Sequence, residues 1–80
     1  MTRAKSSPLY FRLREVLAEK RQAAGLSQTD LAAKLDKPQS YVSKVESGER
    51  GLDVVEFVEW VRAIDADPAR ILRLVLQSTM

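Results

Sequence analysis

The sequence contains no cysteine and no histidine, and these two absences exclude several classes of function. Without them the 80-residue chain has no thiol nucleophile, no imidazole base and no set of the usual zinc ligands. Only three glycines are present, and they do not form a glycine-rich phosphate-binding loop. We therefore expect no catalytic residues, no metal and no cofactor, and an enzyme is the least favoured class.

Long hydrophobic runs are also missing. Arg62, Arg70 and Arg73 interrupt the most apolar part of the chain, and the opening MTRAKSSP has charge but no hydrophobic region of a signal peptide. The lack of cysteine is compatible with a reducing compartment. These features predict a soluble, cytoplasmic protein with no membrane segment.

Charged residues are abundant and unevenly distributed. Residues 1–21 hold six basic and two acidic side chains, residues 22–50 hold four of each, and residues 51–80 hold three basic and five acidic ones. A basic end of this kind suits a module that places one face against a polyanion. Chance clustering on solvated helices is the alternative interpretation of the charge pattern.

Apolar residues recur at helical spacing in five segments, and nowhere do they alternate as in a β-strand. The predicted helices cover residues 9–24, 28–35, 39–47, 54–64 and 68–77. We expect an all-α, five-helix bundle that forms one domain over residues 9–80. Residues 1–8, with Arg3 and Lys5, are interpreted as a flexible N-terminal arm.

Serine or aspartate residues mark three helix starts, and one of them is Asp67, which is followed by Pro68 at the first helical position. Ser27 with Asp30, and Asp53 with Glu56, have the spacing of capping boxes, in which each side chain accepts a hydrogen bond from a backbone N–H group. This structural role accounts for Ser27 and Asp30 without any catalytic pairing.

The helical stripes predict which apolar side chains face the core. They are Leu9, Leu13, Val16, Leu17, Ala24, Leu31, Ala32, Leu35, Val42, Val45, Val54, Phe57, Val58, Val61, Ile64, Ile71, Leu72, Val75 and Leu76. Trp60 widens the stripe of the fourth predicted helix, and with Phe11 and Leu74 it is also one of three surplus apolar residues. We expect them either to form a homodimer interface or to cover one another within one chain.

Residues 28–48, QTDLAAKLDKPQSYVSKVESG, are the centre of the functional interpretation. Pro38 prevents one continuous helix, so the segment predicts two short helices joined by a tight turn. On a helical wheel of the second one, polar residues without a carboxylate share an arc of about 140°. They are Gln39, Ser40, Ser43, Lys44 and Ser47.

This polar arc can hydrogen-bond base edges and phosphates without repelling them. An ordinary solvated helix face is the alternative interpretation. Val42 and Val45 lie on the opposite side, and Glu46 lies at the border between the two. A carboxylate at such a border needs a partner if it is partly buried, and Arg21, at the edge of the first helix stripe, is the candidate.

The string L-S-Q-x-x-L-A-x-K-L-x-x-x-Q-S-x-V-S-K-x-E-x-G, residues 26–48, closely resembles the helix-turn-helix of phage repressor and Cro-type proteins, the Xre-like family. The order of the five helices extends this resemblance over residues 9–77. It implies a lambda-repressor-like fold and sequence-specific binding of double-stranded DNA.

The resemblance implies a role for each matching position. Gln39, Ser40 and Lys44 match positions that read bases in the major groove. Contacts to the DNA backbone are implied for Gln28, Ser43, Ser47 and Arg50, and Gln28 also matches a residue that braces the recognition helix. Arg21 and Glu46 match an ion pair that ties the first helix to the third.

Two positions depart from the family pattern. Gly51 stands where relatives often have a second arginine, which leaves Arg50 as the one cation of its loop. Asp36 stands at a turn position where the family often has glycine, so we expect an aspartate with left-handed backbone there.

Together these features predict a transcription regulator such as a repressor, acting as a homodimer on a palindromic site because one unit touches few base pairs. The alternative is a protein-interaction module, such as an antitoxin that holds a partner protein and for which DNA binding is secondary or lost.

Overall fold

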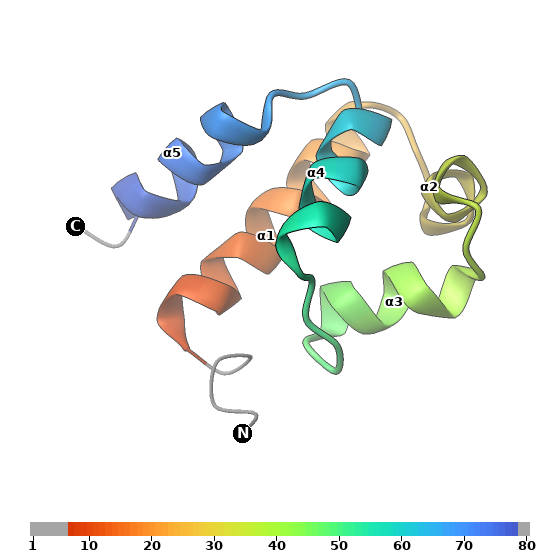
Figure 1. Cartoon of the computed structure of the whole chain (residues 1–80), viewed down its shortest axis with the longest axis horizontal. Helices are drawn as coiled ribbons and strands as arrows, with labels where there is room; N and C mark the ends of the chain where they lie inside the picture. Colours follow the sequence, from red (N-terminus) through yellow and green to blue (C-terminus); the bar gives the residue numbers. More distant parts are fainter. Residues whose placement is uncertain (1–6, 79–80) are drawn as a thin grey trace.

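The computed structural model describes residues 7–78, and this range contains five α-helices and no β-strand (Figure 1). The helices are α1 (Pro8–Ala23), α2 (Gln28–Leu35), α3 (Gln39–Ser47), α4 (Val54–Ala63) and α5 (Pro68–Ser78). The predicted all-α fold is confirmed, and each helix begins and ends within one residue of its expected bounds. The arm predicted for residues 1–8 lies mostly outside the described residues, Arg3 and Lys5 included.

Side chains cap four helix starts, among them that of α5, where Asp67 Oδ1 accepts a hydrogen bond from the Ala69 backbone N–H at 3.1 Å. The Ser7 hydroxyl accepts a hydrogen bond from the Tyr10 backbone N–H, so α1 begins one residue earlier than expected. Complete capping boxes open α2 at Ser27 and α4 at Asp53, as predicted. Each such cap stabilises its helix by about 1 kcal/mol. Within the described residues no helix has the length and apolar character needed to cross a bilayer.

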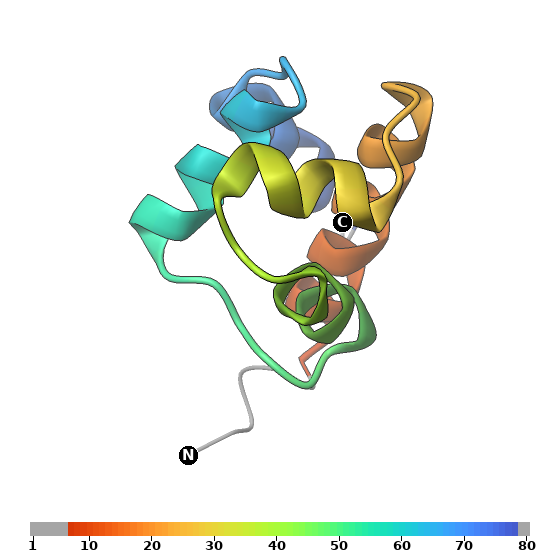
Figure 2. The same cartoon turned by 90° about the vertical axis from the view of Figure 1, so that its right-hand side faces the viewer.

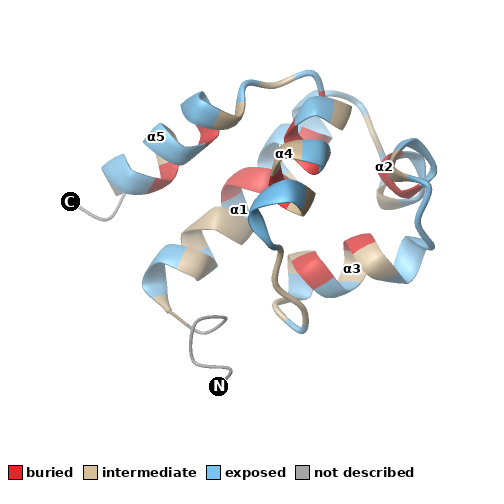
Figure 3. Ribbon diagram, in the orientation of Figure 1, coloured by how far each residue is buried: buried red, intermediate tan, exposed pale blue. Residues whose placement is uncertain are grey.

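The helices pack around one core to which all five contribute. α1 packs against α3 and α5, α2 packs against α3 and α4, and α4 also contacts α5. The buried apolar side chains lie on the faces that the helices turn toward one another (Figure 3). They are Val16, Leu17, Leu31, Ala32, Val42, Val45, Phe57, Trp60, Val61, Ile64, Ile71 and Val75.

The sequence predicts Trp60 either beside the core stripe of its helix or at a dimer interface, and the structure places it in the core rather than at an interface. Its side chain is 0% exposed and lies in the core, with its ring centroid 6.1 Å from that of Tyr41. A residue so deeply buried cannot contact a second molecule without unfolding. The tryptophan therefore completes the core between α3 and α4.

The orientation of α5 also differs from expectation. Leu74, expected outside the core, packs against it beside Ile71 and Val75, whereas Leu72 and Leu76 are 48% and 56% exposed. The apolar arc of α5 is wider than the side that α1 and α4 cover, and α5 is rotated so that Leu72 and Leu76 fall outside the contact.

Three other residues expected in the core are exposed. Leu9 is 46% exposed and Val54 is 78% exposed. Both occupy the first turn of a helix at the edge of the domain, and both line apolar grooves that the neighbouring helices leave open. Ala24 follows the last residue of α1 and is also exposed.

Candidate nucleic-acid interface

The helix α3 lies along one edge of the molecule, at the bottom of Figure 1, and crosses α2 at a steep angle (Figure 2). The tight turn between them depends on Asp36, whose left-handed backbone (φ 57°, ψ 44°) is the conformation predicted for it. Pro38 then occupies the N-cap of α3 in an extended conformation. With this turn between them, α2 and α3 form a helix-turn-helix.

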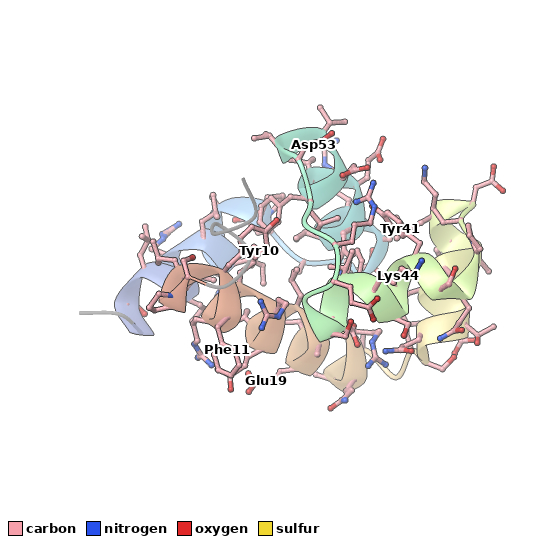
Figure 4. All side chains as sticks on the ribbon, turned by 90° about the horizontal axis from the view of Figure 1, so that it is seen from below. Tyr10, Phe11, Glu19, Tyr41, Lys44 and Asp53 are labelled. Atoms are coloured by element: carbon pink, nitrogen blue, oxygen red, sulfur yellow. The ribbon has the colours of Figure 1, made fainter. Side chains whose placement is uncertain are left out.

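The polar residues of α3 lie on its outer side. Val42 and Val45 are buried, whereas Gln39, Ser40, Lys44 and Ser47 are exposed and Ser43 is half-buried. Figure 4, which looks onto this edge of the molecule, shows Lys44 extending from α3. The side chains are therefore placed where a ligand can reach them, and their contacts with DNA stay a prediction.

Glu46 and Arg21 form a buried, two-pronged ion pair between α3 and α1. Arg21 Nε donates to Glu46 Oε2 at 2.8 Å, and Arg21 Nη2 donates to Glu46 Oε1 at 3.0 Å. Both side chains are under 10% exposed. Arg21 Nη1 also donates to the Leu26 carbonyl oxygen at 2.8 Å. The predicted pair is present, and it fixes the rotation of α3 against α1.

Two glutamines extend this ion pair to the surface. Gln28 Nε2 donates to Glu46 Oε1 at 3.0 Å, and Gln39 Nε2 donates to Gln28 Oε1 at 2.8 Å. The resulting chain runs from α1 through α3 and α2 and back to the first residue of α3. The sequence indicated the ion pair and a bracing role for Gln28, but it did not indicate that the four side chains are continuous.

Arg50, predicted to contact the DNA backbone, is held by the protein. Its Nη1 and Nη2 atoms donate to the two carboxylate oxygens of Glu56 at 3.1 and 2.8 Å, and Nη1 also donates to the Gly51 carbonyl oxygen. The guanidinium carbon lies 4.7 Å from the centre of the Tyr41 ring. These contacts join the loop after α3 to the start of α4.

The contacts among Arg50, Glu56 and Tyr41 shift the pKa of each of these three side chains. Hydrogen bonds from Arg50 and then from the Asp53 backbone hold the pKa of Glu56 below its ordinary value, and the bond to Glu56 raises the pKa of Arg50. Burial, followed by the nearby charge of Glu56, raises the pKa of the Tyr41 hydroxyl. At neutral pH the cluster is thus a stable ion pair beside a neutral phenol.

Arg14 lies beside the C-terminal end of α3. Its guanidinium carbon is 5.2 Å from the centre of the Phe11 ring. It also packs against Gly48 so closely that a Cβ on that glycine would come within 2.8 Å of it. A cation there is favourable because the carbonyl groups at a helix C-terminus carry partial negative charge.

The end of α3 also brings an acidic side chain near the polar face. Ser47 Oγ donates to the Lys44 carbonyl oxygen at 3.2 Å and lies 3.3 Å from Glu49 Oε2. A DNA contact by Ser47 must therefore compete with these bonds. Among the described residues no group of acidic side chains converges to hold a metal ion.

The chain is similar to known proteins in both sequence and fold. Residues 17–71 match the model of a helix-turn-helix family. A solved structure described as an XRE-family like protein from Pseudomonas syringae pv. tomato str. DC3000 is similar over 90% of this chain and 88% of its own. It is 46% identical in sequence and superposes with a TM-score of 0.84. No curated protein matches the chain.

Proposed function

The chain belongs to the Xre-like helix-turn-helix family of DNA-binding regulators, and from this premise we propose that it binds double-stranded DNA sequence-specifically through α3. The observation that carries the proposal is the outer face of α3. Its five polar side chains include no carboxylate, and the chain of hydrogen bonds from Arg21 to Gln39 holds that face rigidly outward.

In this proposal bases are read by Gln39, Ser40 and Lys44. An amide can pair with adenine at N6 and N7, and an ammonium group can reach guanine O6 or N7. Each good contact provides about 1–3 kcal/mol of discrimination between bases. The exposure of all three side chains supports these roles.

Phosphate contacts are proposed for Gln28, Ser43, Ser47 and Arg50, and they fix the register of the protein on the duplex. Arg50 uses three of its five N–H groups on Glu56 and Gly51, so it meets a phosphate with those that remain. The ion pair with Glu56 then holds this side chain in place before DNA arrives.

We further propose that two copies bind a palindromic site, with their recognition helices about 34 Å apart. Support comes from two adjoining apolar pockets that share Leu13 and Leu72 and together form a groove between α5 and the starts of α1 and α4. Its lining includes Leu9, Leu13, Val54, Leu72 and Leu76. This groove replaces the interface first proposed at Phe11, Trp60 and Leu74, because it gathers the exposed leucines of the domain.

Selection of bound duplexes from a random pool tests the proposal. We expect a motif of two similar half-sites to be enriched by the whole chain. A variant with Gln39→Ala and Lys44→Ala, whose substitutions are exposed and leave the core intact, should enrich none. Recovery of random sequences by the unsubstituted protein would contradict sequence-specific binding, and a motif without two-fold symmetry would contradict the dimer alone.

A further inference from the structure

The outer face of α4 is a surface that neither the core nor the proposed DNA contacts use. Its residues recur every three or four positions and so lie on one side of the helix; they are Val55, Val58, Glu59 and Arg62. In Figure 3, α4 lies in front of α1, and pale blue segments mark its exposed side. In Figure 1, α3 forms the bottom edge and α5 lies to the left. The outer face of α4 is therefore distinct from the recognition helix and from the apolar groove beside α5.

Two opposite charges on this face are left without an ion pair. Glu59 and Arg62 are one turn apart, at a spacing that permits an ion pair within a helix. Both are exposed, and neither forms an ion pair with another residue in the range 7–78. Beside them Val55 is 65% exposed and Val58 is half-buried. A face that offers one charge of each sign next to exposed valines is complementary to a second copy of itself.

We propose that this face joins neighbouring DNA-bound dimers through an antiparallel contact between two α4 helices, an inference that rests on the proposed function. In a two-fold contact, residue i of one copy meets residue j of the other, and j meets i. If Glu59 meets Arg62 of the second copy, Arg62 also meets Glu59 of the second copy. Both charges of each copy are then paired.

The same register also brings apolar groups together. Because the two helices run in opposite directions, pairing positions 59 and 62 places Val58 opposite Ala63 of the second copy. Ala63 is small, and it lines a hollow between α4 and α2 whose far wall is Lys34 and Leu35. A valine side chain can enter there without displacing a larger residue. Charge and shape therefore favour one alignment of the two helices.

This contact is weak when the protein is free in solution. It buries few apolar side chains, and its ion pairs are open to water, where each contributes little. Two dimers bound side by side on one duplex are held at a high effective concentration, so a contact that is unpopulated in dilute solution forms there. In this proposal the groove beside α5 makes the dimer, and the outer face of α4 makes dimers bind cooperatively.

Charge reversal tests the contact. The measured quantity is the cooperativity, which is the Kd for one selected palindrome divided by the Kd for the second of two palindromes on the same duplex. The spacing of the two sites is varied in steps of half a helical turn. Glu59→Arg and Arg62→Glu each place like charges opposite one another, whereas a chain with both changes restores opposite charges at unchanged net charge. Arg70→Glu, at an exposed position of α5, is the control for altered charge.

We expect a cooperativity of about fivefold or more, at one spacing at least, for the unsubstituted protein, for Arg70→Glu and for the doubly reversed chain. Each single reversal on α4 should reduce it to less than about twofold. A general effect of charge on DNA binding changes the two Kd values together and leaves their ratio unchanged. Equal ratios in all five proteins, or no cooperativity of the unsubstituted protein at any spacing, would overturn the proposal.

Nuclear magnetic resonance of the DNA-free protein separates this inference from the proposed function. As the concentration is raised to about 1 mM, the amide resonances of residues 55–63 should shift in the unsubstituted protein and in the doubly reversed chain, but not in either single reversal. If no duplex is selected, the proposed function fails, and this series still decides whether the two α4 faces meet. Resonances of the unsubstituted protein that do not depend on concentration would overturn the contact.

Discussion

In this domain a buried ion pair makes the loss of a single side chain costly in unfolding free energy. Arg21 is 7% exposed, and its carboxylate partner, Glu46, lies in the same buried position between α1 and α3. Such a pair adds little net stability compared with apolar residues, but removal of one partner leaves an uncompensated charge in the core. The pair therefore matters more for which structure forms than for how stable it is.

Arg21→Ala should lower the free energy of unfolding by about 3–5 kcal/mol, because Glu46 would be left buried without its cation. Urea denaturation followed by circular dichroism measures the change. Arg12→Ala is the matched control, since Arg12 pairs with Glu15 at 3.3 Å on the surface and its loss should cost less than about 1 kcal/mol. Equal losses in the two variants would contradict the account of the buried pair.

The pair of Arg50 and Glu56 predicts a dependence of stability on pH. Because the folded protein holds the pKa of Glu56 below its ordinary value of 4.5, the stabilisation is present above that pH and is lost as the pH falls through the lower folded value. Asp30, whose pKa is lowered mainly by the Ser27 backbone N–H, contributes in the same direction.

Glu56→Gln isolates the first of these contributions, because glutamine can still accept the capping hydrogen bond from the Asp53 N–H. Melting temperatures measured between pH 6 and pH 3 should fall less steeply in this variant than in the unsubstituted protein. Parallel curves would show that the ion pair does not contribute to the acid sensitivity.

Helices and turns could be predicted where the signal is local. Ser27, Asp53 and Gly48 mark helix ends by their own chemistry, and the left-handed turn at Asp36 follows from its place between two short helices. The rotation of α5 could not be predicted, because Ile71, Leu72, Val75 and Leu76 form one apolar arc and only the neighbouring helices decide which part is covered.

The ion pair of Arg50 with Glu56 could not be predicted either. It joins residues on the two sides of a loop, and the spacing of apolar residues along the sequence carries no information about such a contact.

The glycine that ends α3 has different surroundings from the glycine that follows α1. Gly25 and Gly48 both have left-handed backbone, but a Cβ at position 25 meets open space whereas one at 48 meets Arg14. Gly25→Ala should cost about 1 kcal/mol in unfolding free energy from backbone strain alone.

Gly48→Ala should cost about 0.5–1 kcal/mol more, because Arg14 must leave the Phe11 ring. The same denaturation measurement in an Arg14→Ala background should remove the difference between the two alanine variants. A difference that persists there would assign the extra cost to something other than the arginine.

The whole molecule has two surfaces of opposite character, the polar face of α3 and the apolar groove beside α5. Leu72→Glu with Leu76→Glu should weaken self-association, because these leucines are 48% and 56% exposed and line the groove. Sedimentation velocity measures the association. Val55→Glu, at a position that is 65% exposed and does not line the groove, is the control and should associate normally.

If the proposed dimer forms through this groove, the two leucine substitutions should reduce affinity for a full palindrome much more than affinity for a single half-site, because in that proposal one copy reads each half-site. If the two leucine substitutions leave both the sedimentation behaviour and the binding of the palindrome unchanged, the groove is not the interface.

The claim that the outer face of α3 reads DNA is tested most directly by a binding titration. Fluorescence anisotropy with the selected duplex should give a Kd for the unsubstituted chain that rises steeply with salt, because phosphate contacts release counterions. In the variant with Gln39→Ala and Lys44→Ala, the Kd at fixed salt should be at least about tenfold higher. Equal affinity of the two proteins for that duplex would contradict the account.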